Sequence, residues 1–579
     1  MNKFILCIVI FFAMPAARGQ QTIFEKSDGL KTATYFQVID YYKILSKRSD
    51  KIKVTERGMT DAGYPLHLIL VDESKTFDPA KWHSAGKVVI MINNGIHPGE
   101  PDGIDASMML TRDIINGKVK LPSNVVLGII AVYNIGGALN RFQLTRINQN
   151  GPEQYGFRGN AQNLDLNRDF TKNDSKNARS FAEIFHWLNP DIFIDNHVSD
   201  GADYQPVMTL ISTQYEKLGG KLGQWMKNDF DPELYKIMKG FHWDMVPYVN
   251  VEGSDPSKGY SMFYDSPRYS TGYAALFQTL AYMPETHMLK AYKERVMSTY
   301  DLICAIIQNA SAKARELIQQ RKNAIAEVMK QKDFPLRWVL DTSRYDLIDF
   351  KGYSAGKKAS GLSGLNVLFY DHSKPYEKEI KFFDYYKETD RVTKPAAYII
   401  PQGWWAVTDL LKLNQVKMRR FTKDTILSVT SYHITDLKSM PFAYEKHHKN
   451  SQVKYDTGVE VIHVLKGDYY IPTGQAADRF LVEMLEPKGD DSYFAWNFFD
   501  AILQEKEYFS DYRWNDMATE YLNSNPELKK EFDSRLQSDS SFAKSLRQQL
   551  AFIYERSPYF EAAYKRYPVY RVDKALSKL

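Results

Sequence analysis

The stretch VVIMINNGIHPGE, residues 88–100, decides the fold of this chain of 579 residues. Its first part, Val88–Ile92, is an apolar run with the length and composition of a buried strand. A turn rich in Asn, Gly and Pro follows and places His97 and Glu100 three residues apart. Imidazole nitrogen and carboxylate oxygen suit zinc, and a catalytic zinc needs one more protein ligand and an open position for water.

The H-x-x-E spacing alone is weak evidence. With 12 His in the chain, about one such pair is expected by chance, so its context must support it. From residue 25 to 310, short apolar runs alternate with longer amphipathic ones, which predicts an α/β domain. The expected strands are 66–71, 88–93, 125–133, 191–196 and 280–284. The expected helices are 103–116, 176–188 and one long helix from 291 to about 332.

His197 is the best candidate for a third metal ligand, because it closes the apolar strand Ile192–Asn196. Enzymes of the α/β class place functional groups at the carboxyl ends of their strands. A single His in such a position is more often packed or hydrogen-bonded than bound to a metal. Its interpretation as a ligand therefore depends on the other motifs.

Asp165-x-Asn167-Arg168 lies between these candidates, and Glu285 follows the late apolar run 280–284. The order H-x-x-E, D-x-N-R, His and late Glu resembles the zinc carboxypeptidase (metallocarboxypeptidase) family, in a secreted bacterial type with a long C-terminal extension. The resemblance covers roughly residues 30–310, and the combination is far more specific than any of its parts. It implies a mixed, mostly parallel sheet flanked by helices.

The metal site that the resemblance implies holds one Zn²⁺ per chain, with His97, Glu100 and His197 as ligands. A metal-bound His usually donates its other ring N–H to a carboxylate, which fixes its orientation. In the family, the Asp of D-x-N-R has this role for the first His. We therefore expect Asp165 beside His97.

The substrate site that the resemblance implies uses Asn167 and Arg168 to hold the terminal carboxylate of a peptide. A guanidinium suits this task, because its planar fork meets a carboxylate with two parallel hydrogen bonds. Glu285 matches the general base, which takes a proton from the zinc-activated water and passes it to the leaving amine. Without the resemblance, Asn167 and Arg168 could cap a helix and Glu285 could be a helix N-terminal acid.

Two further roles remain open between several residues. The family has a Tyr that closes over the substrate some twenty residues before the catalytic Glu, and both Tyr264 and Tyr269 qualify. An Arg that stabilises the oxyanion should precede D-x-N-R, where Arg141, Arg146 and Arg158 compete. Arg146 lies in polar loop sequence, as Arg158 does, and we favour Arg146.

The chain also departs from the family pattern. The digestive branch carries an Arg in the pair between its first His and Glu, where this chain has Pro98-Gly99. A contact to the peptide is therefore missing or supplied elsewhere. Asp169 directly follows Asn167-Arg168 and could orient Arg168 or favour a basic or amine-bearing terminal residue. The preferred terminal residue stays open.

The first 19 residues have the features of a secretory signal. One Lys precedes the apolar run Phe4–Met14, and Ala17-Arg18-Gly19 supplies small residues before a cleavage point at Gln20. The run is shorter than the roughly 20 apolar residues that span a bilayer, and no later segment is long and apolar enough to be a transmembrane anchor. Export to a periplasmic or extracellular location is expected.

The remaining sequence divides into three units. Residues 20–335 form the expected catalytic domain, 336–490 a β-rich accessory domain with short strands between turn residues, and 491–579 a mostly helical C-terminal region. The formal charge of +5 is nearly balanced, which argues against a nucleic-acid partner.

These observations predict an exported zinc metallocarboxypeptidase that hydrolyses the C-terminal peptide bond of peptides. A related zinc amidohydrolase that acts on cell-wall peptides or N-acyl amino acids carries the same motifs and remains an alternative. A non-catalytic binding protein on the same fold is a third. The apparent retention of all three metal ligands and the base argues against the third.

Overall fold

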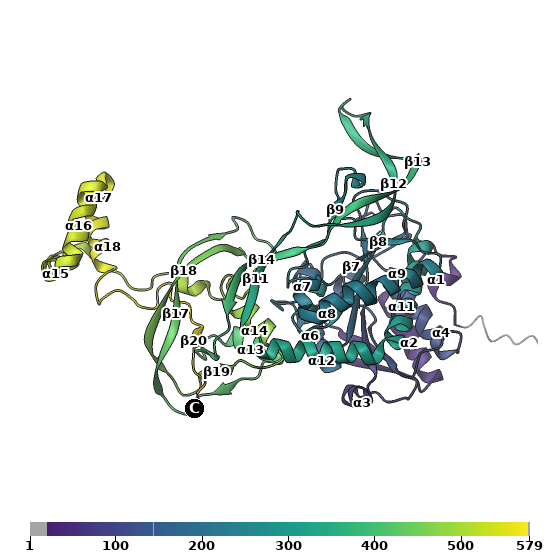
Figure 1. Ribbon diagram of the computed structural model, residues 1–579, viewed down its shortest axis with the longest axis horizontal. Coiled ribbons are helices and arrows are strands. Elements are labelled where there is room, and N and C mark those ends of the chain that lie inside the picture. The colour runs from purple at the N-terminus through teal and green to yellow at the C-terminus, as the bar shows by residue number, and fades with distance from the viewer. Residues whose placement is uncertain (1–19, 143, 577–579) are drawn as a thin grey trace, which may run out of the picture.

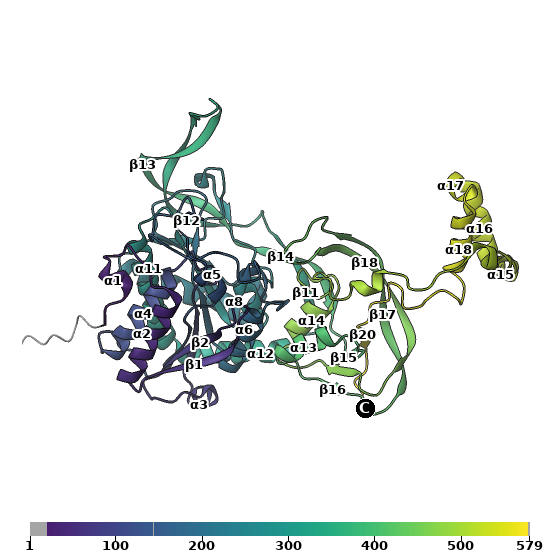
Figure 2. The same ribbon diagram turned by 180° about the vertical axis from the view of Figure 1, so that it is seen from behind.

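The computed structural model describes residues 20–142 and 144–576, so the predicted signal sequence lies outside the described residues. Its largest element is a nine-stranded sheet in the order β1-β2-β4-β3-β5-β10-β7-β8, with β6 paired to β10. Helices cover this sheet (Figures 1 and 2). The strands are β1 (Ile52–Met59), β2 (Pro65–Val71), β3 (Val88–Asn93), β4 (Val125–Ile130), β5 (Ile192–Asp195), β6 (His197–Ser199), β7 (Met208–Ser212), β8 (Met245–Pro247) and β10 (Leu280–His287).

The centre of the sheet is parallel and its outer pairings are mostly antiparallel. Strand β3 runs parallel to β4 and β5, and β10 runs parallel to β5 and β6. The pairs β1–β2, β2–β4 and β10–β7 are antiparallel, whereas β7–β8 is parallel. The predicted fold class, a mixed and mostly parallel sheet flanked by helices, is therefore confirmed. The carboxyl ends of β3, β5 and β10 meet at one edge, where the site residues lie.

The helices around the sheet mostly follow the sequence pattern, with one exception. Helix α4 (Asp102–Ile115) and helix α6 (Lys176–Leu188) lie where they were expected. The predicted single helix from 291 to about 332 is wrong, because the chain forms α11 (Tyr292–Ala312) and α12 (Ala314–Lys330). Asn124 explains the interruption, since its side-chain amide binds the backbone oxygen of Ser311 at 3.0 Å and its Oδ1 accepts from the Ser311 hydroxyl at 2.8 Å.

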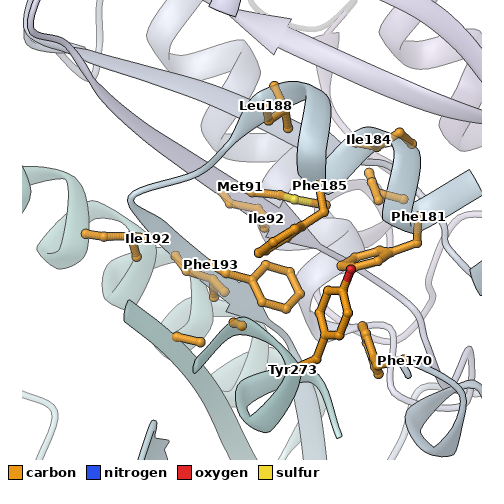
Figure 3. Close-up of a cluster of buried hydrophobic side chains, with 14 of the residues drawn as sticks. Met91, Ile92, Phe170, Phe181, Ile184, Phe185, Leu188, Ile192, Phe193 and Tyr273 are labelled. Carbon is orange, nitrogen blue, oxygen red and sulfur yellow. The ribbon is translucent and has the colours of Figure 1, made fainter. Parts of the chain in front are cut away.

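A buried aromatic cluster joins α6 to the sheet, to the loop after the D-x-N-R segment and to helix α10 (Figure 3). The ring of Phe181 lies 5.5 Å from that of Phe193 on β5 and 5.0 Å from that of Phe170. Phe170, which closely follows the D-x-N-R segment, also contacts Tyr273 on α10 (Ser270–Ala275) at 5.8 Å between ring centroids. Because all four rings are buried, this core fixes the position of the loop and of α10 relative to the sheet.

The accessory region after α12 contributes to three sheets. In the first, β11 pairs with β14. In the second, the hairpin β12–β13 projects from the molecule and pairs with β9 of the preceding region (Figure 1). The third is a six-stranded sheet in the order β16-β19-β15-β20-β17-β18, next to helices α13 (Trp405–Leu413) and α14 (Asp478–Leu485). The strands of these sheets are β9 (Tyr260–Ser261), β11 (Asp333–Leu340), β12 (Asp346–Ala359), β13 (Asn366–Phe383), β14 (Tyr386–Thr393), β15 (Ala397–Ile400), β16 (Arg419–Arg420), β17 (Thr425–Ser439), β18 (Asn450–Val464), β19 (Tyr469–Pro472) and β20 (Tyr570–Val572).

The C-terminal region contains four helices with a core of their own, which stand apart from the β-rich region in both views (Figures 1 and 2). They are α15 (Asp511–Asn523), α16 (Pro526–Ser538), α17 (Ser540–Ala543) and α18 (Leu546–Tyr554). The chain then returns, and β20 pairs with β15 and β17 of the six-stranded sheet. The predicted boundaries at 335 and 490 stay predictions, although β11 begins at Asp333 and β20 belongs to the sheet of the preceding unit. Within the described part of the chain, no helix has both the length and the apolar character needed to cross a bilayer.

Candidate metal centre and substrate cavity

The ends of two neighbouring strands, β3 and β5, bring the predicted metal ligands together. His97 and Glu100 lie in the turn between β3 and α4, and His197 is the first residue of β6. In the sheet, His197 stands beside Glu285 of β10 in parallel register. Residues 97, 100 and 197 are all buried, and one potential ligand atom from each lies within 4.8 Å of those of the other two.

The two histidines present the same ring atom to the same carboxylate. His97 Nδ1 is 3.2 Å from Glu100 Oε1, and His197 Nδ1 is 3.1 Å from Glu100 Oε2. His97 Nδ1 is buried and makes no hydrogen bond with the residues that the structure describes. Two imidazoles and a carboxylate are the donor set of many catalytic zinc sites, and an unpaired buried nitrogen is what a metal ligand leaves when the ion is removed. The residues present therefore fit a zinc ion.

Each histidine contacts an acidic side chain through Nε2, the ring nitrogen that faces away from the shared centre. His97 Nε2 lies 2.9 Å from Asp165 Oδ1, as the resemblance implies, and His197 Nε2 lies 3.0 Å from Asp195 Oδ2. Asn93 at the end of β3 donates to the other oxygen of Asp195 at 2.9 Å. These contacts leave both Nδ1 atoms directed at the shared centre, the arrangement typical of metal-binding histidines.

Charge and burial act differently on the two carboxyl groups of the site. Burial alone would raise the pKa of Glu100, but the facing His97 imidazole and the Arg146 guanidinium outweigh it and hold that pKa well below its usual range. Burial raises the pKa of Glu285 to about 8, with the His197 imidazole opposing the shift and the Glu100 carboxylate adding to it. Glu100 is thus a ligand-like anion, and Glu285 is a carboxyl group poised to exchange a proton near neutral pH.

The D-x-N-R segment forms a short 3₁₀ turn, Leu166–Arg168, beside the metal site. Asp165 caps this turn by accepting from the backbone N–H of Asn167 at 2.9 Å while its carboxylate also contacts His97. The guanidinium of Arg168 stacks over the ring of Tyr269 at 4.6 Å, and its Nη1 donates to the backbone oxygen of Asn167 at 2.8 Å. One carboxylate therefore fixes both a metal ligand and the turn that carries Asn167 and Arg168.

These groups line a single cavity of about 270 Å³. Eight of the predicted site residues are among its walls: His97, Glu100, Arg146, Asn167, Arg168, His197, Tyr269 and Glu285. Asp165 lies behind the wall, as expected for the partner of a ligand. The cavity thus brings the metal ligands, the acid–base candidate and the guanidinium of the proposed carboxylate site into one space.

The two Arg candidates in polar loop sequence, Arg146 and Arg158, both line the cavity. Arg146 Nη1 donates to Glu100 Oε1 at 2.8 Å and its Nη2 to the backbone oxygen of Val198 at 3.3 Å. Arg158 pairs with Asp165 at 2.9 Å and lies further from Glu100 Oε1, at 3.8 Å. The side chain of Arg146 also crosses Gly99, where a Cβ atom would stand only 2.7 Å from Arg146 Cδ. Glycine at this position therefore makes room for the guanidinium.

The two Tyr candidates occupy different places. Tyr269 lies against Arg168 and lines the cavity. The hydroxyl of Tyr264 donates to Asp490 of the accessory region at 2.6 Å, and the Lys217 ammonium lies over its ring at 4.4 Å. Tyr264 therefore belongs to a contact between the two regions, and the geometry favours Tyr269 for the substrate.

Asp169 has a local structural role. Its carboxylate accepts from the ammonium of Lys172 at 2.9 Å and from the hydroxyl of Ser175 at 2.6 Å, and it caps the loop that leads into α6. This arrangement gives Asp169 neither of the two roles suggested by its position in the sequence. The position of Asp169 therefore does not indicate a preference for substrates with a basic terminal residue.

Asp195 and Tyr248 are among the site residues that were missed in the sequence. Asp195 could have been found, because it stands two residues before His197 in one extended run, at the end of β5 where β6 begins, and residues two apart in extended chain face the same side. Tyr248, which lines the cavity together with Ile211 and Phe263, follows β8 and carries no motif. Only its position in the folded sheet brings it to the site.

Comparison with known proteins supports the resemblance. The curated protein Carboxypeptidase 2 of Trichophyton tonsurans is 20% identical over 443 residues, covering 71% of this chain and 74% of that protein. No protein-family profile matches the chain. Among solved structures, the metallo-carboxypeptidase from Burkholderia cenocepacia aligns with 48% of this chain and 70% of its own at 14% identity and a TM-score of 0.36. The metallo-carboxypeptidase from Pseudomonas aeruginosa, in complex with (2-guanidinoethylmercapto)succinic acid, aligns with 48% of this chain and 69% of its own at 14% identity and a TM-score of 0.35.

The fold and the site define a class: an α/β protein with a buried His₂Glu cluster at the carboxyl edge of a mostly parallel sheet. The curated relative, together with this cluster, confirms the resemblance to the metallocarboxypeptidases and supports an enzyme of that general kind.

Proposed function

We propose that this protein is an exported, zinc-dependent carboxypeptidase that removes the C-terminal residue of peptides. The observation that carries the proposal is the shared cavity, in which the His97–Glu100–His197 cluster and Glu285 face the same space as Arg168. A metal cluster alone would suit many amide substrates. A guanidinium within the same cavity selects an amide that has a free carboxylate close to the bond to be cleaved.

Asn167 and Arg168 bind the terminal carboxylate in this proposal and so set which bond reaches the metal cluster. The guanidinium of Arg168 is already stacked on Tyr269, and its position is therefore largely fixed before substrate arrives. Apolar side chains of Ile211, Phe263 and Met283 line the same cavity. They offer contact area to the side chain of the departing residue.

Glu285 acts as the general base and then as the general acid. A zinc ion held by His97, Glu100 and His197 would supply Lewis acidity and a water molecule of lowered pKa. Glu285 accepts a proton from the attacking water and donates it to the leaving amine nitrogen. Its position in the cavity, beside His197 of the metal cluster, places it next to the bond at which both proton transfers occur.

Arg146 stabilises the negative charge that develops on the carbonyl oxygen. Its guanidinium is held beside Glu100 at 2.8 Å and needs no reorganisation when the charge forms. It also fills the space over Gly99, at the residue pair where the digestive branch carries an Arg. We infer that Arg146 supplies the positive group that this pair lacks.

Cell-wall peptides are a second candidate substrate, favoured by two carboxylates at the cavity. Asp200 and Glu252 both line it and are exposed. An amine-bearing substrate next to the cleaved bond would find a charge partner there. The predicted export of the chain is compatible with either kind of substrate.

The test is mass spectrometry of a mixed peptide pool incubated with the protein lacking residues 1–19, with and without a zinc chelator. We expect loss of single C-terminal residues, abolished by the chelator and by Glu285→Gln, while C-terminally amidated peptides stay intact. Glu316→Gln is a matched control, because this residue is exposed on α12. Cleavage of amidated peptides at the same rate would contradict the proposal, and cleavage of cell-wall fragments alone would select the second substrate class.

A further inference from the structure

The connection between β17 and β18 of the accessory sheet reaches the D-x-N-R segment, whose Asn167 and Arg168 line the substrate cavity. Residues 440–449, which we call the β17–β18 turn, end in a tight hairpin in which Tyr444 and His447 exchange backbone hydrogen bonds of 2.8 and 3.0 Å. The two residues between them, Glu445 and Lys446, both have positive φ angles of 47° and 76°. Non-glycine residues persist in this conformation where the surrounding structure holds them there.

Three side chains of the β17–β18 turn contact one segment of the catalytic domain. The hydroxyl of Tyr444 accepts from Arg168 Nε at 2.9 Å. Glu445 accepts from the backbone N–H of Asp165 at 2.9 Å, and His447 Nε2 lies 2.8 Å from the carboxylate of Asp174. The turn therefore binds the D-x-N-R segment at its first residue, at its Arg and just beyond it.

A buried tryptophan fixes the turn in this position. Trp496, which is fully buried, stacks on Tyr444 with 6.1 Å between ring centroids and 17° between the ring planes. It also contacts His447 edge-on at 5.6 Å. On the catalytic side, the ammonium of Lys172 lies 5.5 Å from the same ring. The tyrosine is thus held by packing that does not involve its hydroxyl.

Tyr444 completes the set of groups that orient the Arg168 guanidinium. Tyr269 covers one face, Nη1 donates to the backbone oxygen of Asn167 and lies 3.8 Å from Asp165 Oδ2, and the Tyr444 hydroxyl accepts from Nε. Among the described residues, these contacts leave the edge of the guanidinium that carries Nη2 to meet a ligand in the cavity. A restrained guanidinium loses less conformational freedom when it binds a carboxylate than a free one does.

We propose that Tyr444 is a positioning residue for the carboxylate-binding Arg168, so that the accessory domain contributes to substrate binding. This inference rests on the proposed function, because it assigns Arg168 to the terminal carboxylate. Loss of the Tyr444 hydroxyl should therefore weaken the binding of substrates that carry a free carboxylate. The metal cluster and Glu285 do not depend on it.

The test compares Tyr444→Phe with the unchanged protein on peptides with a free C-terminus. The Phe variant keeps the ring that stacks on Trp496 and removes only the hydroxyl, so we expect an unchanged thermal unfolding midpoint and unchanged zinc content. KM should rise about tenfold, while kcat changes by less than about twofold. Tyr512→Phe is the matched control, because Tyr512 is 79% exposed on α15, a helix that stands apart from the catalytic sheet in Figure 1.

A binding measurement separates this inference from the proposed function. In the Glu285→Gln background, calorimetry would compare a peptide carboxylate with its amide, with and without Tyr444→Phe. We expect about tenfold weaker binding of the carboxylate and unchanged binding of the amide. If the unchanged protein trims no peptide but this difference persists, only the proposed reaction is overturned. Equal carboxylate affinity with and without the Tyr444 hydroxyl would overturn the role of Tyr444.

Discussion

The wall of the cavity that carries the metal ligands and the wall that carries Arg168 differ in where their supporting groups come from. His97 and His197 are held by Asp165 and Asp195, at 2.9 and 3.0 Å, within the catalytic domain. Arg168 is held by Tyr269 and also by Tyr444, which lies 276 residues further along the chain. The metal wall is thus supported from within the catalytic domain, whereas the carboxylate wall also receives a contact from the accessory domain, and Asp165 supports both walls. Metal binding and substrate binding should therefore respond separately to mutation, except at Asp165.

The largest effect is expected for His197→Ala, which removes a ligand from the metal wall. Metal affinity should fall by more than the roughly 100-fold that loss of an outer partner can cost, and turnover should fall below detection. Bound zinc measured by elemental mass spectrometry after dialysis checks this. His463→Ala is the control, because this residue is exposed on β18. A fully zinc-loaded His197→Ala protein would show that the cluster is not the metal site.

Glu285→Gln should separate chemistry from metal binding within the same wall. We expect retained zinc and a loss of kcat of about 10²–10⁴-fold, the range of a general acid–base group. Pre-steady-state and steady-state kinetics on one peptide measure it. Near-normal turnover in this variant would remove Glu285 from the mechanism.

Asp195→Asn tests the support of the metal wall. The change keeps the size of the side chain but weakens the acceptor behind His197, and we expect metal affinity to fall about 10–100-fold. A competition titration with a zinc chelator measures it. Asp165→Asn should have a similar effect on zinc and should also raise KM, because Asp165 caps the turn that carries Arg168. An effect of Asp195→Asn on KM alone would break the proposed separation of the two walls.

Arg168→Lys tests the carboxylate wall. A lysine keeps the charge but loses the planar fork, so KM should rise about tenfold with zinc content unchanged. Initial rates over a range of peptide concentrations, with zinc measured on the same sample, are sufficient. If this variant loses its metal, the two walls are not independent.

The smallest effect concerns stability without metal. Because the folded-state pKa of Glu285 is about 8, above its ordinary value, the folded protein holds this proton more tightly than the unfolded chain does. The contribution to stability is full below about pH 4.5 and is lost as the pH rises towards 8. Glu285→Gln should therefore stabilise chelator-treated protein more at pH 8 than at pH 5, by at most a few kcal/mol. The unfolding midpoint of the variant, compared with that of the unchanged protein, should accordingly be shifted upward more at pH 8 than at pH 5. An equal difference at both pH values would contradict the raised pKa.

Most of the metal wall could be predicted from the sequence, and most of the carboxylate wall's surroundings could not. The apolar strand followed by H-x-x-E identifies His97 and Glu100 from residues that are close in the sequence. His197 can be found in the same way, because it directly follows an apolar strand. Tyr444 gives no such signal, because its partner is set by the packing of two domains. The break between α11 and α12 has the same cause, since Asn124 reaches the helix only in the folded state.

The position of β20 has a consequence for the order in which the site is assembled. Residues 570–572 lie between β15 and β17 in the sheet whose β17–β18 connection carries Tyr444. During synthesis this sheet cannot close until these residues have left the ribosome, whereas every strand of the catalytic sheet is complete some 280 residues earlier, since domains form from the N-terminus onward. A growing chain can therefore hold its metal ligands in place while Arg168 is still without its accessory partner. The contact of Tyr444 with Arg168 is therefore among the last parts of the site to form.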